Sequence, residues 1–178
     1  MKNKYSSFEN LYKCDVLIIG CGPAGSSLSA FLSEYGLDII IIDKKKYIEE
    51  PVRCAEFVPA DFVNLFNFKL EGIDSYIENL ETYININKIS ELKSPGYLID
   101  RKIMINDLIE KSKKNGVKYF SCTKALKISL NEVTAERNGI KIIIRPNIIV
   151  GADGPLSAVG KYMGSLNSHF IVGINYKY

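Results

Sequence analysis

The stretch CDVLIIGCGPAGSSLSAFLSEYGLDIIIID, residues 14–43, decides the fold of this chain. Its apolar run Val16–Ile19 is rich in β-branched residues, which is typical of a strand buried on both faces of a sheet. The pattern then predicts a helix over residues 23–35 and a second strand over residues 37–42. Strand, helix and strand in this order predict a βαβ unit with parallel strands.

A glycine turn, G-x-G-x-x-G, joins the first strand to the helix. Gly20 permits the tight turn, Gly22 lets a pyrophosphate approach the backbone, and Gly25 lets the helix pack closely on the sheet. Pro23 stands in the first helical turn, where its missing N–H costs nothing. The helix start directs its free N–H groups and positive dipole end at that phosphate.

An acid closes the unit. Asp43 follows Gly25 by 18 residues, close to the spacing of about 20 at which a carboxylate binds a ribose hydroxyl. An acid here suits an unphosphorylated ribose, so FAD or NAD fits better than NADP. The alternative is a glycine-rich structural turn, but the strand, the helix and the acid around the motif favour dinucleotide binding.

Composition excludes several function classes. The 178 residues are 47% hydrophobic and 24% charged, as in an ordinary soluble globular protein. The net charge of +3 is spread along the chain, and the densest basic run, Lys44–Lys46, has no interleaved aromatics, so nucleic-acid binding is not expected. Residues 1–13 lack the apolar stretch of a signal peptide, and no run reaches the length of a membrane span.

Four widely spaced cysteines without a C-x-x-C pair favour a reduced, cytoplasmic setting. The single histidine, His169, makes both a metal cluster and a Ser-His-Asp triad implausible.

The rest of the chain predicts a doubly wound domain with extra strands. Turns at Asn131 and at Asn138-Gly139 indicate that residues 125–145 form an antiparallel ribbon. Helices are expected over residues 61–68 and 103–115, and strands over 80–86, 96–101, 117–120, 125–130, 133–136, 140–145, 148–150 and 170–178.

The expected fold class is therefore α/β, a Rossmann-like FAD/NAD(P)-binding domain with a central parallel sheet and an inserted β-ribbon. Residues 14–165 form this domain, residues 1–13 form a polar lead-in, and residues 166–178 form the first strand of an incomplete substrate domain.

In four stretches the sequence resembles the FAD-dependent geranylgeranyl reductases, within the larger group folded like para-hydroxybenzoate hydroxylase. The first is the glycine turn with IIIID, residues 16–43. EPVRCAE, residues 50–56, is similar to the family's P-V-x-C-(G/A)-E loop and is the most discriminating. GYLIDRKIMINDLI, residues 96–109, is similar to Y-x-(I/L)-x-R followed by a helix. IIVGADGPLSAVGK, residues 148–161, is similar to the Asp-Gly motif of flavin hydroxylases and these reductases.

The resemblance departs from the hydroxylase form at one point. An arginine commonly follows the Ser-Ala-Val of that motif, whereas this chain has Gly160-Lys161. The difference weakens the hydroxylase interpretation and leaves the reductase interpretation intact.

The resemblance also implies which residues contact FAD. Asp43, with neighbouring Lys44, is expected at the adenosine ribose, and the backbone of Ala125 at the adenine. Arg101 is expected to contact the cofactor from a helix start. The pyrophosphate is expected to lie against Gly20, Gly22, Pro23, Ala24 and Gly25.

Two further groups complete the implied site. Arg53, Cys54 and Ala55 are expected to lie against the flavin. Asp153 and Gly154 are expected near the pyrophosphate, where they shape the groove that a reduced donor approaches. No catalytic residue and no metal ligand is assigned.

The function implied is FAD-dependent reduction of isoprenoid double bonds of the geranylgeranyl type in lipid or tetrapyrrole side chains, with hydride passing from the flavin to the alkene. NAD(P)H and ferredoxin are both open as electron donors, and a membrane-borne apolar substrate implies peripheral membrane contact. The alternatives are a flavin monooxygenase or halogenase-like enzyme, and a non-catalytic dinucleotide-binding fragment that needs a partner chain. Because the Gly-Asp pair of a third FAD contact is absent from the sequence, we expect the N-terminal part of a longer enzyme.

Overall fold

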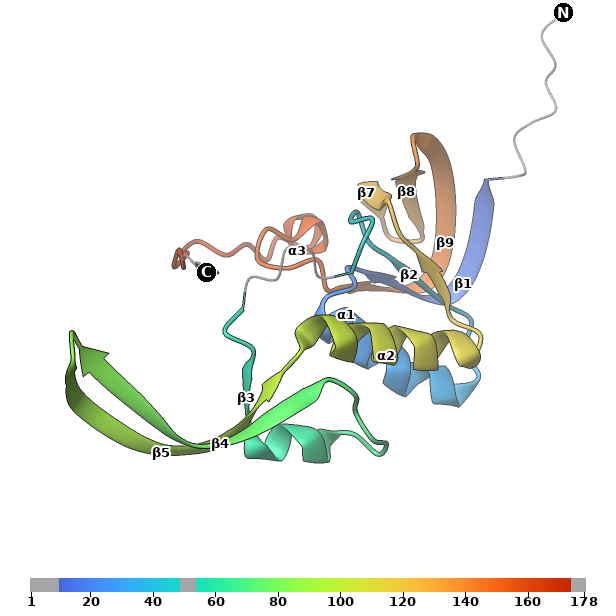
Figure 1. Ribbon diagram of the computed structural model, residues 1–178. Coiled ribbons are helices and arrows are strands. Elements are labelled where there is room, and N and C mark those ends of the chain that lie inside the picture. The colour runs from blue at the N-terminus through green and yellow to red at the C-terminus, as the bar shows by residue number, and fades with distance from the viewer. Residues whose placement is uncertain (1–9, 49–53, 174–178) are drawn as a thin grey trace, which may run out of the picture.

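A six-stranded sheet with two helices on one face forms the body of the domain in the computed structural model, which describes residues 10–48 and 54–173 (Figure 1). The strand order is β6-β2-β1-β9-β8-β7. Four neighbouring strands are parallel: β6 (Lys118–Phe120), β2 (Ile39–Ile42), β1 (Leu11–Ile19) and β9 (Ile140–Gly151). The antiparallel strands β8 (Glu132–Arg137) and β7 (Thr123–Ser129) extend the sheet at one edge. The predicted α/β class with a mainly parallel sheet is confirmed.

The βαβ unit forms as predicted. Helix α1 (Pro23–Leu32) continues into the 3₁₀ turn η1 (Ser33–Tyr35) and ends at Gly36, whose φ of 69° is left-handed. All four isoleucines of β2 are fully buried, as expected for a strand covered on both faces. Strand β1 begins at Leu11, inside the expected lead-in, because Leu11 already pairs with Ile143 of β9.

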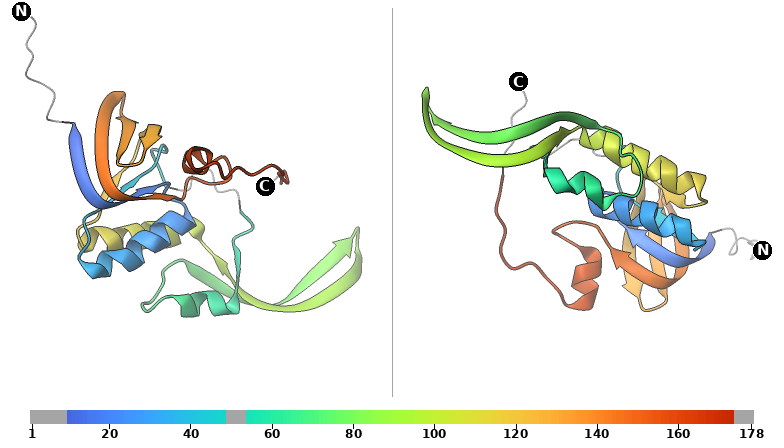
Figure 2. Two further views of the ribbon diagram at one scale, coloured as in Figure 1. Left: turned by 180° about the vertical axis from the view of Figure 1, so that it is seen from behind. Right: turned by 90° about the horizontal axis from the view of Figure 1, so that it is seen from below.

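Helices α1 and α2 (Arg101–Lys114) lie side by side on one face of the sheet (Figures 1 and 2). A buried hydrogen bond of 2.5 Å joins Ser29 Oγ of α1 to Ser112 Oγ of α2. Asp100 caps α2, since its side chain accepts a hydrogen bond from the Ile103 N–H at 2.8 Å. Each helix leads into a strand of the parallel part of the sheet, α1 into β2 and α2 into β6, so both helices start at the same end of the domain.

Alternating strand residues fill two core clusters. One cluster includes Val16, Ile18 and Ile41 and packs against α1 and α2. The other includes Leu17 and Ile40 and packs against β8 and β9 on the opposite face. Both faces of the central strands are therefore covered, which is why their sequence is apolar without alternation.

The predicted ribbon is confirmed, but it is continuous with the main sheet. The two strands expected over residues 140–145 and 148–150 are one strand, β9, which runs through Pro146. Pairing between β9 and β8 ends at Ile144, so Pro146 lies where β9 has a neighbour on one side only. A proline is tolerated at such a position because no second strand needs its N–H.

A second, three-stranded antiparallel sheet has the order β3-β5-β4. Its strands are β3 (Phe57–Pro59), β4 (Ile73–Ile84) and β5 (Asn87–Ile99). The strand expected over residues 80–86 is the end of β4 and the turn after it, the strand expected over residues 96–101 is the end of β5 and the start of α2, and β3 was not predicted. The β4–β5 hairpin extends away from the rest of the domain (Figures 1 and 2).

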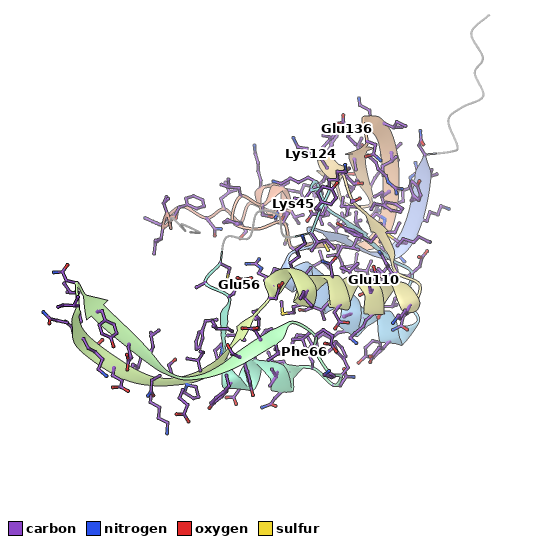
Figure 3. The ribbon with its side chains drawn as sticks, viewed as in Figure 1. Lys45, Glu56, Phe66, Glu110, Lys124 and Glu136 are labelled. Carbon is purple, nitrogen blue, oxygen red and sulfur yellow. The ribbon has the colours of Figure 1, made fainter. Side chains whose placement is uncertain are left out.

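Aromatic packing anchors this second sheet to α1. The short helix expected over residues 61–68 is the 3₁₀ helix η2 (Ala60–Leu65). Phe66, which Figure 3 labels, lies just after η2. Its ring stacks on that of Phe31 of α1 with centroids 5.5 Å apart. Phe68 packs beside both rings.

The outer half of the hairpin has one polar and one apolar face. On the polar face, Lys88 Nζ lies 3.1 Å from a Glu81 oxygen and 2.7 Å from a Glu91 oxygen. On the apolar face, Leu80 pairs with Leu92, and these side chains are 56% and 62% exposed. Neither core cluster of the described residues includes any residue between Asp74 and Gly96. The apolar face therefore has no hydrophobic cover within the part of the chain that the structure describes.

The end of the chain differs from the expectation. After the short helix α3 (Ala158–Met163), residues 170–173 form no strand, because Ile171 and Val172 are exposed and pair with no neighbouring strand. The remainder of the expected strand, residues 174–178, lies outside the described residues. None of the described helices is long and apolar enough to cross a bilayer.

The exposed hairpin face predicts a measurable property. Replacing Leu80 and Leu92 together by threonine keeps β propensity but removes the apolar surface. We expect the double variant to bind less 8-anilinonaphthalene sulfonate and to self-associate less in light scattering than the wild type. Glu91→Gln, on the polar face, is the matched control. Equal dye binding by the double variant and the wild type would contradict the described exposure.

Candidate cofactor site

The glycine turn is shaped by two backbone contacts that leave no room for side chains. Gly20 has a φ of +104°, and a Cβ there would collide with the backbone of Ala152 and Asp153. A Cβ on Gly25 would collide with the carbonyl oxygen of Gly20. The turn and the Asp-Gly segment are therefore in contact, at the carboxyl ends of the adjacent parallel strands β1 and β9. In open α/β sheets this is where ligands bind.

The start of α1 is left open for an anion. Gly22 is the N-cap and supplies no side-chain cap, Pro23 follows directly, and no acid stands in the first turn. A helix start has N–H groups without intrahelical partners and a partial positive charge. Because no side chain caps this start, the turn fits a pyrophosphate group.

Asp43 joins the turn to the end of β2. Its carboxylate accepts hydrogen bonds from the N–H of Cys21 at 2.7 Å and from the N–H of Lys45 at 2.8 Å. Its backbone N–H donates to the Phe120 carbonyl at 3.0 Å, and its carbonyl accepts from the Thr123 N–H at 2.7 Å. A carboxylate has about four acceptor positions, so these two bonds leave capacity for a ribose hydroxyl.

The connection from β6 to β7 wraps around Asp43. Cys122, with a left-handed φ of 50°, donates its N–H to the Lys45 carbonyl at 3.0 Å. Ala125, the expected adenine contact, follows three residues later on β7 and is half-buried. Lys44 is exposed at the same corner, where Figure 3 labels Lys45 and Lys124. The structure thus brings the predicted ribose and adenine residues together.

Sequence reasoning missed Cys122, Thr123 and Tyr119 in this corner. Burial raises the pKa of the Tyr119 hydroxyl well above its ordinary value, and the nearby Cys21 and Asp43 raise it further. The sequence gives no signal for Tyr119, because its place near Asp43 results from the pairing of β6 with β2.

The Asp-Gly segment uses its acid to hold helix α3. The Asp153 carboxylate accepts hydrogen bonds from Ser157 Oγ at 2.5 Å and from the Ala158 N–H at 2.6 Å. Gly154 has a φ of +86° and turns the chain toward α3. These bonds fix the segment whose backbone touches Gly20, so Asp153 shapes the turn from the β9 side.

Two of the three residues expected at the flavin, Cys54 and Ala55, lie near the start of α2. Cys54 is half-buried and Ala55 is exposed, while Arg53 falls outside the described residues. Glu56 links this loop to the helix, because its Oε1 accepts a hydrogen bond from the Arg101 N–H at 3.2 Å. Glu56 is the last residue of the loop motif EPVRCAE, and the sequence alone assigns it no role.

The contact between α1 and α2 fixes how far the start of α2, at Arg101, lies from the start of α1 along the helix axes. Because Ser29 of α1 lies opposite Ser112 of α2, α2 starts about five residues, or ~7 Å, beyond the start of α1. The roles of Arg101, Cys54 and the other named residues toward a cofactor stay predictions.

Within residues 10–48 and 54–173, no group of three or more histidine, cysteine, aspartate or glutamate side chains is placed to hold an ion.

The close approach at Gly25 predicts a large effect from one methyl group. Gly25→Ala would favour the helix by propensity, yet its Cβ collides with the Gly20 carbonyl. We expect a loss of about 1–3 kcal/mol in the free energy of unfolding, measured by urea denaturation. Ser27→Ala, on the same helix, is the control. A Gly25→Ala chain as stable as the control would contradict this packing.

Comparisons with known proteins agree with the geometry. Residues 13–57 match the family model described as FAD binding domain. The digeranylgeranylglycerophospholipid reductase of Methanothrix thermoacetophila is 32% identical over 164 residues, which cover 85% of this chain and 42% of that protein. The reductase of the same name from Methanosarcina acetivorans is 34% identical, over 84% of this chain and 40% of its own length.

Solved structures show the same fold. A geranylgeranyl bacteriochlorophyll reductase-like protein of Thermoplasma acidophilum aligns with a TM-score of 0.74 at 23% identity, over 86% of this chain and 42% of that one. The p-nitrophenol 4-monooxygenase PnpA of Pseudomonas putida also aligns with a TM-score of 0.74, at 14% identity, over 86% of this chain and 44% of that one.

An uncharacterised protein of Methanosarcina barkeri is 30% identical over 84% of this chain and 87% of its own length. By contrast, the chain spans about 40% of the length of the curated reductases that it matches. Homology over most of its length, the FAD-binding model over residues 13–57 and the shared fold show that the chain is related to the digeranylgeranylglycerophospholipid reductases and has an FAD-binding fold.

Proposed function

We propose that this chain forms the FAD-binding part of a reductase that saturates isoprenoid double bonds of the geranylgeranyl type. The observation that carries the proposal is the single unit made by the glycine turn, the uncapped start of α1 and Asp43, joined by the bond from the Cys21 N–H to the Asp43 carboxylate. This unit offers a phosphate site and a ribose acceptor next to each other. The family model over residues 13–57 supports FAD as the dinucleotide.

The names of the relatives support the proposed substrate class. The archaeal homologues are named as reductases of digeranylgeranylglycerophospholipid, which favours a lipid-borne isoprenoid over a tetrapyrrole side chain. The monooxygenase neighbour shares the fold at 14% identity, and such a likeness carries no argument about the reaction. The reductase is therefore the better-supported function.

When bound, FAD would supply hydride transfer to the alkene, and the protein would supply binding and orientation. Gly20, Gly22 and Gly25 would admit the pyrophosphate, and Asp43 would accept from the ribose. Arg101 would add a cation beside the cofactor from the start of α2. Either NAD(P)H or ferredoxin would supply the electrons. The enzyme would work in the cytoplasm, at the membrane surface.

The proposal also assigns a contact to the uncovered hairpin face. The matched reductases are more than twice as long as the part that this chain represents. We infer that the apolar face around Leu80 and Leu92 packs against the polypeptide that contains the rest of such a reductase, because a two-stranded hairpin has little stability of its own.

The cofactor assignment predicts a coloured protein. The purified chain should show a flavin absorption spectrum, alone or after addition of FAD. Asp43→Ala removes the ribose acceptor and the partner of the Cys21 N–H, so we expect FAD affinity to fall by at least about tenfold, or ~1.4 kcal/mol. Glu136→Ala, an exposed acid on β8 (Figure 3), is the control. A colourless chain that is indifferent to FAD would contradict the proposal.

The hairpin contact predicts association in trans. The tagged chain, co-expressed with the segment of the Methanothrix thermoacetophila reductase that lies outside the match, should co-purify with it. The Leu80→Thr, Leu92→Thr double variant should retain less of that segment. Equal retention by the wild type and the double variant would show that this face is not the contact.

A further inference from the structure

We propose that Glu56 is a positioning residue of the cofactor site, which holds the Cys54–Ala55 loop against the start of α2. Cys54 and Arg101 would then be presented to FAD as one unit rather than as two independent elements. The inference rests on the proposed function and adds a residue to it.

Glu56 has an unusual backbone conformation, with a positive φ. Four non-glycine residues of the described chain have a positive φ: Glu56 at 60°, Asn85 at 55°, Cys122 at 50° and Asn138 at 50°. The two asparagines occupy hairpin turns, where asparagine tolerates the left-handed region. Glutamate and cysteine have no such tolerance, and a left-handed backbone persists in them only where the surroundings determine it.

Both of these residues border predicted cofactor contacts. Cys122 lies beside Asp43, through its bond to the Lys45 carbonyl. Glu56 lies between Cys54 and Arg101. Strained backbone in folded proteins gathers at ligand sites, so its place here agrees with a functional arrangement.

Glu56 contacts three different segments. Its carbonyl accepts from the Ile99 N–H at 2.8 Å, at the end of β5. Its carboxylate accepts from the Arg101 N–H at 3.2 Å, at the first residue of α2. Its own N–H donates to the Cys54 sulfur at 3.3 Å. One residue thus connects the loop, the strand and the helix.

The carboxylate contact uses a donor that the helix itself leaves open. The first N–H groups of a helix have no intrahelical acceptor, and negative charge is favourable there. Asp100 accepts from the Ile103 N–H, and Glu56 accepts from the Arg101 N–H. Because Glu56 reaches this donor from the Cys54 loop, its side chain adds to the Ile99 backbone bond in holding that loop beside the Arg101 backbone.

Three substitutions separate positioning from simple stabilisation. Glu56→Gly relieves the left-handed strain but removes the carboxylate, whereas Glu56→Ala keeps the strain and removes the carboxylate. We expect the glycine variant to melt at or above the temperature of the alanine variant, while both bind FAD about tenfold more weakly than the wild type. Glu56→Gln should bind FAD nearly as the wild type does, since its amide oxygen can accept from the same N–H.

The matched control is Glu110→Ala, which removes an acid from the exposed face of the same helix (Figure 3), where its Oε1 is 2.7 Å from Lys113 Nζ. Its FAD affinity should equal that of the wild type. If Glu56→Gly binds FAD as tightly as the wild type, the positioning role is wrong.

A second measurement does not depend on FAD. Iodoacetamide labelling of the chain without cofactor, followed by peptide mass spectrometry, reports the placement of Cys54, with Cys122 as the internal reference. Cys54 should be labelled faster in Glu56→Gly and Glu56→Ala than in the wild type or Glu56→Gln. Unchanged Cys54 rates would overturn the positioning role. Changed rates in a chain that binds no FAD would support it and would instead contradict the proposed function.

Discussion

The hydrogen bond from the Cys21 N–H to the Asp43 carboxylate is the contact on which the arrangement of the cofactor site depends. It ties the glycine turn after β1 to the end of β2, so the phosphate and ribose ends of the predicted site are fixed relative to each other. The turn reaches this position only because Gly20 and Gly25 have no Cβ. The same absence of side chains lets the Ala152–Asp153 backbone lie against the turn from the β9 side.

Three other acidic side chains also accept hydrogen bonds from backbone N–H groups and hold segments together. Asp100 holds the start of α2, Asp153 holds the start of α3, and Glu56 reaches the first N–H of α2 from another segment. Each carboxylate thus accepts from backbone N–H groups near the carboxyl edge of the sheet. A site whose loops are fixed in this way loses little conformational freedom when a ligand binds, which favours affinity.

Local pattern predicted the parts of the fold that local chemistry determines. The glycine turn, the helix that ends at Gly36, the four isoleucines of β2 and the Asn138-Gly139 turn lie where their sequence indicates. The features that depend on contacts between distant segments could not be predicted as well. The sequence predicted two strands, over residues 140–145 and 148–150, because whether β9 has one neighbour or two at Pro146 depends on residues far away in the sequence.

The candidate site divides in the same way. Asp43 and the glycines follow from spacing, whereas Cys122, Thr123 and Glu56 join the site through contacts between distant segments. The full length of the β4–β5 hairpin was also missed, because its exposed leucines and its charged face do not give the simple alternation of a strand with one buried side.

The pairing of β1 with β9 has a consequence for how the domain forms. Leu11 pairs with Ile143, and Ile19 pairs with Gly151, so the central strand acquires its second neighbour only from residues more than 120 positions later. Contacts of such high sequence separation slow folding, because the intervening chain loses entropy before the contact is made. During synthesis, the apolar β1 and β2 must therefore leave the ribosome well before the strand that covers them.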